Sequence, residues 1–315
     1  MDYGLVYPED INTAYLRQHY SAWLDSGNQG AMQYIDRRLD ILCDPFGTRP
    51  NAKCALVIAF APKPDLHSPL LELPQPQGDN AISASIAGYA MEEDYHITGL
   101  RILERISQEL DVWSESCVDA KPVPEKEFAG IARIGEKGLN TLMRLPGLGC
   151  RLNLGVLFLG RRYEQKTVKP HSTEDCCCAC GRCVSLCPNG ALDGHGSINV
   201  RRCRSWLSGQ KRGALTKDEQ LALRGALFGC SVCSTCCPDD NVKIPDRNVD
   251  ALAVFNMPAA QLRRIITGTA LEHSGTTLLK RNAAAALCCA RPELAPILLK
   301  NTDSPAIQET IGEWF

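Results

Sequence analysis

Several features of membrane, exported and nucleotide-binding proteins are missing from this chain of 315 residues. No apolar run approaches the roughly 18 residues that a membrane-spanning helix requires. The first residues, MDYGLVYPEDINTAYLRQHY, contain no basic stretch followed by an apolar one and no twin arginines, so we expect a cytoplasmic protein. The segment PGLG at 146–149 lacks the third glycine of a dinucleotide fingerprint, which argues against nicotinamide or flavin binding. The net charge of −2 shows no basic excess for nucleic acid.

Cysteine is abundant instead, with 17 residues, and eight of these follow the spacing of iron–sulfur ligands. In the bacterial ferredoxin pattern C-x2-C-x2-C-x3-C-P, the fourth cysteine ligates the other cluster. The chain has the run Cys177-x2-Cys180-x2-Cys183-x3-Cys187-Pro188, and then Cys203 and Cys230-x2-Cys233-x3-Cys237-Pro238. The pattern therefore predicts two [4Fe–4S] clusters, one bound by Cys177, Cys180, Cys183 and Cys237 and the other by Cys187, Cys203, Cys230 and Cys233.

Two other interpretations of the cysteines are weaker. Pairs spaced C-x2-C also bind zinc, but the two Cys-Pro endings and the eight reciprocal ligands favour clusters. A disulfide framework is disfavoured because the chain is long and shows no export signal. Three further cysteines leave the choice of cluster ligands open. Cys176 and Cys178 flank a ligand without fitting the spacing, and Cys236 could compete with Cys237 as a ligand. We prefer Cys237 because it precedes proline and has the x3 gap.

The composition divides the chain into three predicted domains, residues 1–168, 169–250 and 251–315, and the expected fold class is α+β. The first domain is expected to be mixed α/β, with buried strands at 55–61 and 154–159 and an amphipathic helix at 99–110. A proline-rich segment at 64–80 is expected to be a surface loop. The second domain should be ferredoxin-like and short of regular structure, because metal–thiolate bonds hold it.

The third domain is predicted to contain helices at 258–267, 278–290, 292–300 and 304–315, a short HEAT-like tail. Cys288 and Cys289 within it are expected to be small buried residues. Its closely grouped basic residues could contact phosphates or simply form solvated helix faces; they are Arg263, Arg264, Lys280, Arg281 and Lys300.

Outside the cysteines, Asp119 is the most suggestive polar residue. It follows a possible strand and precedes a proline turn, where a carboxylate can face a pocket. An aspartate that only caps a turn is the commoner case, and the residues alone leave both interpretations open.

Several further segments carry a family resemblance. They are Gly30-Ala-Met-Gln-Tyr-Ile35 with Asp44-Pro45, Gly88-Tyr-Ala…Asp94-Tyr-His96, Val118-Asp119 with Pro122-Val123 and Glu125, the two cysteine runs with Arg202-Cys203, and Leu279-Lys-Arg-Asn-Ala-Ala284. Taken in order and almost end to end, these segments resemble the epoxyqueuosine reductase family, the cobalamin and iron–sulfur enzymes that complete queuosine in tRNA and are related to reductive dehalogenases.

The resemblance implies an N-terminal corrinoid-binding domain with base-off cobalamin, electrons delivered through the two clusters, and Asp119 as the proton donor. It also implies a tRNA substrate and a low-potential external donor such as a flavodoxin or ferredoxin. The residues expected to contact the corrin are Tyr89, Asp94, His96, Lys137, Asn140 and Thr141.

Two other classes of function stay open. The chain could be a related corrinoid and iron–sulfur reductase that acts on a small molecule. An acidic or neutral entrance to the active site would favour this alternative. A non-enzymatic electron-transfer protein would need no corrin site in its first domain.

Overall fold

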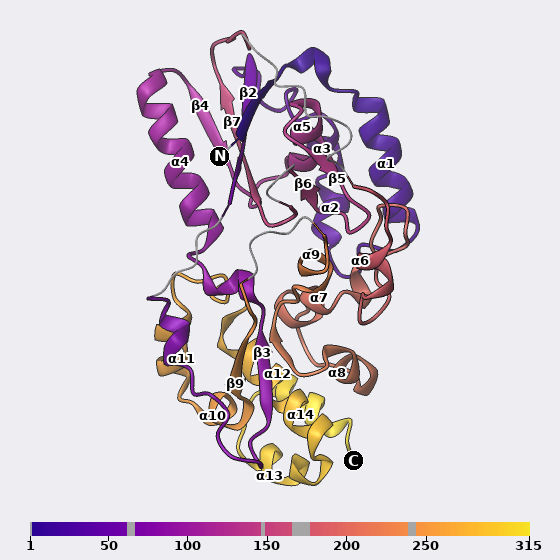
Figure 1. The fold of residues 1–315 in the computed structure, drawn as a ribbon, viewed down its shortest axis with the longest axis vertical. Helices are drawn as coiled ribbons and strands as arrows, with labels where there is room; N and C mark the ends of the chain where they lie inside the picture. Colours follow the sequence, from indigo (N-terminus) through magenta and orange to yellow (C-terminus); the bar gives the residue numbers. More distant parts are fainter. Residues whose placement is uncertain (1, 62–66, 146–148, 166–176, 239–243) are drawn as a thin grey trace.

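The computed structural model describes residues 2–61, 67–145, 149–165, 177–238 and 244–315. The chain builds an upper body and a lower body, with the cysteine-bearing segments beside the junction between them (Figure 1). The first half of the chain forms most of the upper body. Within the described ranges, no helix has both the length and the apolar character needed to cross a membrane.

The upper body is built on a four-stranded sheet of order β1-β2-β7-β4, in which every neighbouring pair is antiparallel. Helix α4 packs on one face, and α5 packs on the other (Figure 1). The two central strands are apolar along most of their length because both of their faces are covered. The strands are β1 (Asp2–Val6), β2 (Cys54–Phe60), β4 (Ser114–Cys117) and β7 (Asn153–Leu159).

Side-chain alternation divides the apolar residues of these strands between two cores. Val57 and Phe158 point toward α5 and pack with Phe128, whereas Ile58 and Leu157 point toward α4 and pack with its Leu103. The predicted strands and the amphipathic helix are therefore confirmed. The helices of this body are α1 (Thr13–Asp25), α2 (Gln33–Arg37), α3 (Leu39–Cys43), α4 (Tyr95–Leu110) and α5 (Glu125–Ile131), with a 3-10 turn at Pro8–Asp10 and a hairpin of β5 (Glu136–Lys137) and β6 (Met143–Arg144).

The lower body joins distant parts of the chain through a second sheet, of order β8-β3-β9. Its central strand comes from the first half of the sequence, runs parallel to β8 and runs antiparallel to β9. Residues of the first predicted domain thus share a core with the last one, although the domain boundaries themselves stay a prediction. The elements are β3 (Ser83–Ile86), β8 (Ala226–Phe228) and β9 (Arg247–Asp250).

The segment expected to be a surface loop is irregular and mostly exposed over its described residues, as expected, but two of its leucines are buried. Residues 64–66 lie outside the described ranges, but Pro69–Glu72 forms a 3-10 turn against α11. Leu70 and Leu73 are 0% and 1% exposed and belong to the core of the lower body. Proline-rich composition indicated an irregular backbone, but it carried no information about which leucines a distant helix would cover.

The helical pattern predicted for the end of the chain is confirmed. The helices are α10 (Ala251–Asn256), α11 (Ala259–Ile266), α12 (Gly275–Ala290), α13 (Ala295–Lys300) and α14 (Pro305–Gly312), with a 3-10 turn at Pro292–Leu294. Helix α12 is central and packs against α10, α14 and β8. Cys288 is buried within it, as expected, and Cys289 is half-buried.

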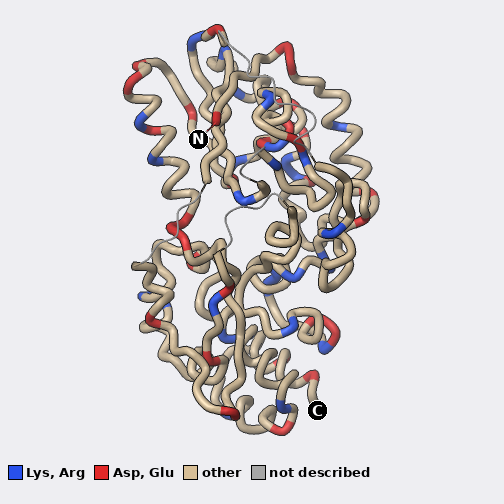
Figure 2. The backbone as a smooth tube through the Cα atoms, in the orientation of Figure 1, with Lys and Arg blue, Asp and Glu red and all other residues tan. Residues whose placement is uncertain are grey.

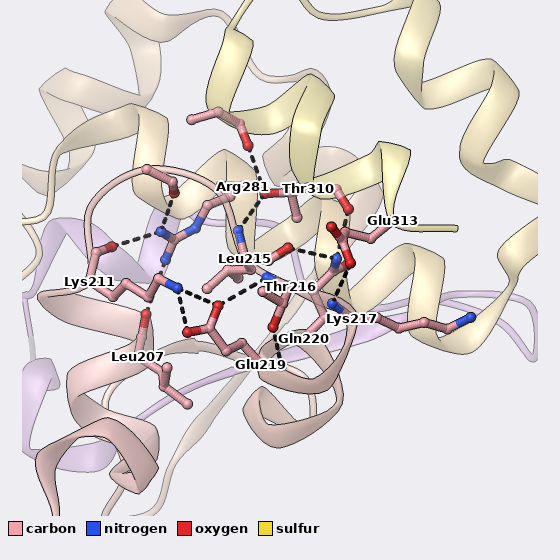
Figure 3. Close-up of polar contacts among 12 residues, drawn as sticks. Leu207, Lys211, Leu215, Thr216, Lys217, Glu219, Gln220, Arg281, Thr310 and Glu313 are labelled. Carbon is pink, nitrogen blue, oxygen red and sulfur yellow. Dashed lines mark hydrogen bonds and ion pairs between the residues drawn. The ribbon is translucent and has the colours of Figure 1, made fainter. Parts of the chain in front are cut away.

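Arg281 on α12 is not a surface cation. Its side chain is 0% exposed and donates to the carbonyl oxygens of Leu207 and Lys211, which Figure 3 labels. It also donates to the carbonyl oxygen of Gly213 and to Asn282 Oδ1. Burial lowers its pKa to about 10. The expectation that Arg281 could contact a phosphate backbone was therefore wrong. The residue ties the tail to the segment around α7.

The cysteine-bearing segments form short helices beside the junction of the two bodies (Figure 1). Helices α6 and α9 pack together, and α7 and α8 pack on α12 of the lower body. Their bounds are α6 (Arg182–Ser185), α7 (Arg204–Gly209), α8 (Lys217–Leu223) and α9 (Val232–Thr235), with 3-10 turns at Gly88–Met91 and Val200–Arg202.

Candidate active site and cluster sites

The first group of cysteines lines a small cavity at the packed pair α6 and α9. Gly181, with φ of 70°, makes the left-handed turn that starts α6 after Cys180. Cys183 lies on α6, and Cys237 follows α9 two residues after its end. The cysteines that line this cavity are Cys177, Cys178, Cys180, Cys183, Cys237 and Cys150.

A larger cavity, of about 400 Å³, is lined by the second group, Cys187, Cys203, Cys230 and Cys233. Cys203 caps the start of α7, and Cys233 lies on α9. Burial, and then the thiols of Cys230 and Cys187, raise the pKa of Cys203. Burial also raises the pKa of Cys233, and the thiols of Cys230, Cys203 and Cys187 add to the rise. Four thiols placed this way repel one another once ionised, so the arrangement calls for a positively charged group between them.

The structure thus separates the eight cysteines into the same two groups that the ferredoxin pattern predicts, while the ligand assignment itself stays a prediction. The first group lies nearer the surface, where Cys178 and Cys180 are exposed. The second group faces the larger cavity. Cys236 is half-buried beside Cys237, and Cys176 lies outside the described residues.

Asn140 lies between the two cysteine cavities and lines both. Its Nδ2 donates to Cys150 Sγ at 3.4 Å and to the carbonyl oxygen of Cys233 at 2.9 Å. Cys150 is buried and also borders both cavities, a placement that no spacing in the sequence indicates. Of the other residues expected at the corrin, Tyr89 and Thr141 line the larger cavity too.

Asp119 lies two residues beyond the end of β4, in the left-handed region with φ of 51°. Its side chain is 64% exposed, and its Oδ2 accepts a hydrogen bond from Tyr95 Oη at 2.6 Å. The Nε2 atom of His96 lies 3.8 Å from the same oxygen. The backbone N–H of Asp119 donates to Glu125 Oε1 at 2.8 Å. Burial raises the pKa of Glu125 to about 8, although this hydrogen bond opposes the rise.

Asp94 and His96 support Asp119 from the start of α4. Asp94 caps the helix through the N–H of His96, and its Oδ1 lies 2.7 Å from His96 Nδ1. The hydrogen bond to Asp94 raises the pKa of His96, against the effect of burial. Burial acts to raise the pKa of Asp94, but the hydrogen bonds that Asp94 accepts from His96 outweigh it, so this pKa is lowered. Asp94 and His96, expected at the corrin, thus lie in contact with the Asp119 group, and neither is among the residues that line the cavities.

A third cavity, of about 490 Å³, opens beside Asp119. Thr141 and Ile198 line both this cavity and the 400 Å³ cavity. Helix α1 reaches it through Trp23, whose Nε1 donates to the carbonyl oxygen of Ile198 at 3.0 Å. Its walls carry the aromatic residues His19, Tyr20, Trp23 and Tyr34, the basic residues Arg38, Lys121, Lys126 and Lys137, and the acidic residues Asp119, Glu125 and Glu127.

Sequence reasoning missed the contribution of α1 and of Tyr95 to this site. The aromatic residues of α1 look like ordinary amphipathic positions, because only the folded chain brings them to the Asp119 turn. Tyr95 stands inside the Asp94-Tyr-His96 block, so its position beside two candidate residues was a usable signal.

The chain is similar to known proteins in sequence and in fold. The chain matches a family model described as a 4Fe-4S double cluster binding domain at residues 176–240. It is 26% identical to the epoxyqueuosine reductase of Pseudomonas aeruginosa, over 85% of this chain and 73% of that protein. It is also 26% identical to that of Cyclobacterium marinum, over 82% of this chain and 84% of that protein.

The fold matches solved structures as well. An epoxyqueuosine reductase from Streptococcus thermophilus aligns with a TM-score of 0.80 at 21% identity, over 98% of this chain and 84% of that one. A crystal structure of epoxyqueuosine reductase with an epoxyqueuosine-modified tRNA-Tyr stem loop aligns with a TM-score of 0.81 at 19% identity, over 99% of this chain and 93% of that one. The resemblance to the epoxyqueuosine reductase family that the sequence motifs predict is therefore confirmed, in sequence over most of the chain and in its mixed helix and strand fold.

Proposed function

We propose that this chain is a reductase of the epoxyqueuosine reductase type, which converts epoxyqueuosine to queuosine in tRNA. The observation that carries the proposal is that two cavities share the wall residues Thr141 and Ile198, one cavity being lined by the second cysteine group and the other opening beside Asp119. This arrangement joins a source of electrons to a group that can donate a proton. Reduction of the epoxide to an alkene consumes two electrons and two protons and releases water, so the reaction needs both.

The cysteine groups support a path for single electrons. Each group surrounds its own cavity, and four thiolates suit a [4Fe–4S] cluster. An external donor, such as a flavodoxin or ferredoxin, would reduce the exposed first cluster. The buried second cluster would then pass electrons into the 400 Å³ cavity.

The larger cavity also suits the corrin of cobalamin. Its lining is mostly apolar and it lies directly against the second cysteine group. Tyr89, Asn140 and Thr141 would hold the ring there, and Thr141 also lines the cavity beside Asp119. When bound, cobalamin supplies a cobalt centre that accepts single electrons and acts on the carbon skeleton of the substrate.

The residues around Asp119 would manage the proton. Asp119 would give a proton to the departing epoxide oxygen, and Tyr95 would stabilise the carboxylate that remains. His96, held by Asp94 and lying 3.8 Å from Asp119, could then return a proton. The raised pKa of His96 favours the protonated ring that this step requires.

The substrate would enter through the 490 Å³ cavity. Its aromatic walls can stack on a base, and the cations around it can contact phosphates. Charged residues of both signs are otherwise spread along the whole molecule (Figure 2). This cavity, rather than the tail, is therefore where we expect tRNA contacts. A tRNA substrate also fits the expected cytoplasmic location.

The test combines metal content with product analysis. Protein purified without oxygen should contain about eight irons per chain for two [4Fe–4S] clusters. With cobalamin and a chemical reductant, it should convert epoxyqueuosine to queuosine in a tRNA-Tyr stem loop, measured by mass spectrometry of the nucleosides. Iron- and cobalamin-loaded protein that leaves the tRNA unchanged would favour a small-molecule reductase. Iron-loaded protein that binds no cobalamin would favour an electron-transfer protein.

Binding to tRNA gives an independent test at the entrance. Affinity should fall steeply with salt, because each contacted phosphate releases counterions. Charge reversal at Arg38 and Lys137, which line the 490 Å³ cavity, should weaken binding and lower the slope against log salt by roughly one for each lost contact. Charge reversal at Lys300 on the tail is the control and should leave the slope unchanged.

A further inference from the structure

Glu92 and Arg151 form a buried ion pair in the wall of the 400 Å³ cavity. Arg151 Nη2 donates to Glu92 Oε1 at 2.8 Å, and the two side chains are only 7% and 3% exposed. Glu92 comes directly before the Glu93–Asp94 entry to α4, and Arg151 stands two residues before β7. The pair thus faces the same cavity as the second cysteine group.

The proposed function does not use this pair, and burying it is unfavourable. Removing two charges from water costs several kcal/mol for each ion, and their attraction often does not repay it. Burial raises the pKa of Glu92 to about 7 even though Arg151 opposes the rise. Replacing such a pair by apolar side chains of similar size is often neutral or stabilising. A ligand that uses both charges would explain why a charged pair lies here.

The chemistry of the pair specifies the group it can bind. A carboxylate only accepts hydrogen bonds and a guanidinium only donates them. A primary carboxamide offers one of each: its C=O can accept from Arg151 while its NH₂ donates to Glu92. A carboxylate in the same place would bring a second negative charge beside Glu92, in surroundings of low dielectric where like charges repel strongly.

We propose that Glu92 and Arg151 bind one of the carboxamide side chains on the rim of a corrinoid, and so select the amidated form over the corresponding acid. The inference rests on the proposed function, because it requires a corrinoid in the 400 Å³ cavity. It adds a specificity site to the contacts expected there.

The test compares cobalamin with its isomeric monocarboxylic acids, in each of which one rim amide is replaced by a carboxylate. Iron-loaded protein would be titrated with each compound, and the change in corrinoid absorbance would give Kd. The wild-type protein should bind one of the acids at least about tenfold more weakly than cobalamin, because a hydrogen-bond donor is lost and a charge is added. Glu92→Gln should reduce the ratio of the Kd of this acid to the Kd of cobalamin by about tenfold, since it removes the repelling charge and keeps the size of the side chain.

The matched control is Glu115→Gln. Glu115 also pairs with an arginine, Arg49, but lies outside the residues that line the cavity. It should leave every Kd unchanged. If Glu92→Gln loses its iron, Arg151→Lys replaces it, because lysine keeps the charge but loses the planar fork. Arg151→Lys should weaken the binding of cobalamin more than the binding of the monocarboxylic acid that the wild-type protein binds more weakly.

The outcomes separate the inference from the proposed function. If wild-type protein with full iron binds no corrinoid, the cofactor part of the proposed function is wrong and the inference is wrong with it. If it binds cobalamin but the variants weaken all compounds equally, or change none, the pair only supports the fold and the inference alone is overturned.

Discussion

Removal of the carboxylic acid at Asp119 is the change with the clearest expected effect on catalysis. In an Asp119→Asn variant, the amide oxygen of the new side chain would still accept the hydrogen bond from Tyr95, so the turn should be preserved, but the amide could not deliver a proton. We expect turnover to fall by roughly 10²–10⁴, the usual contribution of a positioned general acid. Iron content and cobalamin affinity should not change, because Asp119 lies outside both cysteine cavities.

The hydrogen bond from Tyr95 allows the magnitude to be refined. Tyr95 Oη donates to Asp119 Oδ2 at 2.6 Å, and a hydrogen bond to a charged group contributes about 1.5–3 kcal/mol. Because the Asp119 side chain is 64% exposed, we take the lower end of that range, which corresponds to about tenfold in rate for Tyr95→Phe. We expect Tyr95 to act on the chemical step through Asp119, although its side chain also lines the 400 Å³ cavity, so the double variant should be no slower than Asp119→Asn alone.

Single-turnover conversion of an epoxyqueuosine-containing stem loop is the suitable assay, because it isolates the chemical step from product release. Tyr3→Phe, at an exposed residue of β1, is the control and should leave the rate unchanged. Full activity in Asp119→Asn would refute the catalytic role and leave Asp119 as a turn residue. Additive losses in the double variant would show that Tyr95 acts on something other than Asp119.

Three other predictions follow from the cysteine groups, the tail and the Asp94–His96 pair. Cys183→Ser and Cys237→Ser should remove the same cluster signal in electron paramagnetic resonance, whereas Cys187→Ser should remove the other. Arg281→Met should lower the free energy of unfolding by about 1–3 kcal/mol, measured by denaturant titration, because it leaves the buried carbonyl oxygen of Leu207 and the partly buried ones of Lys211 and Gly213 without this donor. The pKa of His96 is raised above 6.5 in the folded state. The contribution of protonated His96 to folding stability should therefore be complete below pH 6.5 and be lost as the pH rises through the folded-state pKa. The difference in Tm between wild type and His96→Gln should be largest in acid.

The first two of these predictions have a matched control, and the third has a result that would contradict it. Cys178→Ser should leave both cluster signals intact, and loss of a cluster there would show that the ligand register is shifted. Lys280→Glu, next to Arg281, should change stability little, because Lys280 makes none of the hydrogen bonds that hold Arg281. A difference in Tm at position 96 that grows toward alkaline pH would contradict the sign derived from the Asp94 contact.

Short-range patterns in the sequence were sufficient for the cluster domain and for several elements. Thiolate spacing is a local property, because one tight loop supplies three ligands, so the cysteine runs could be grouped without the structure. The central strands β2 and β7 were recognisable because covering both faces of a sheet requires continuous apolar residues. Asp119 could be singled out from its strand-to-proline context.

Contacts between distant segments were decided only by the tertiary structure. Arg281 looks like one of several cations on a helix, and only the fold surrounds it with the carbonyl oxygens of another segment. The strand β3 gave no sign that it would pair with β8 and β9, which lie far away in the chain. The same holds for the pairing of Glu92 with Arg151 and for the approach of α1 to Asp119. The chemistry of a side chain can be read from the sequence, but its burial and its partners depend on which remote surfaces fold against it, and local periodicity does not encode them.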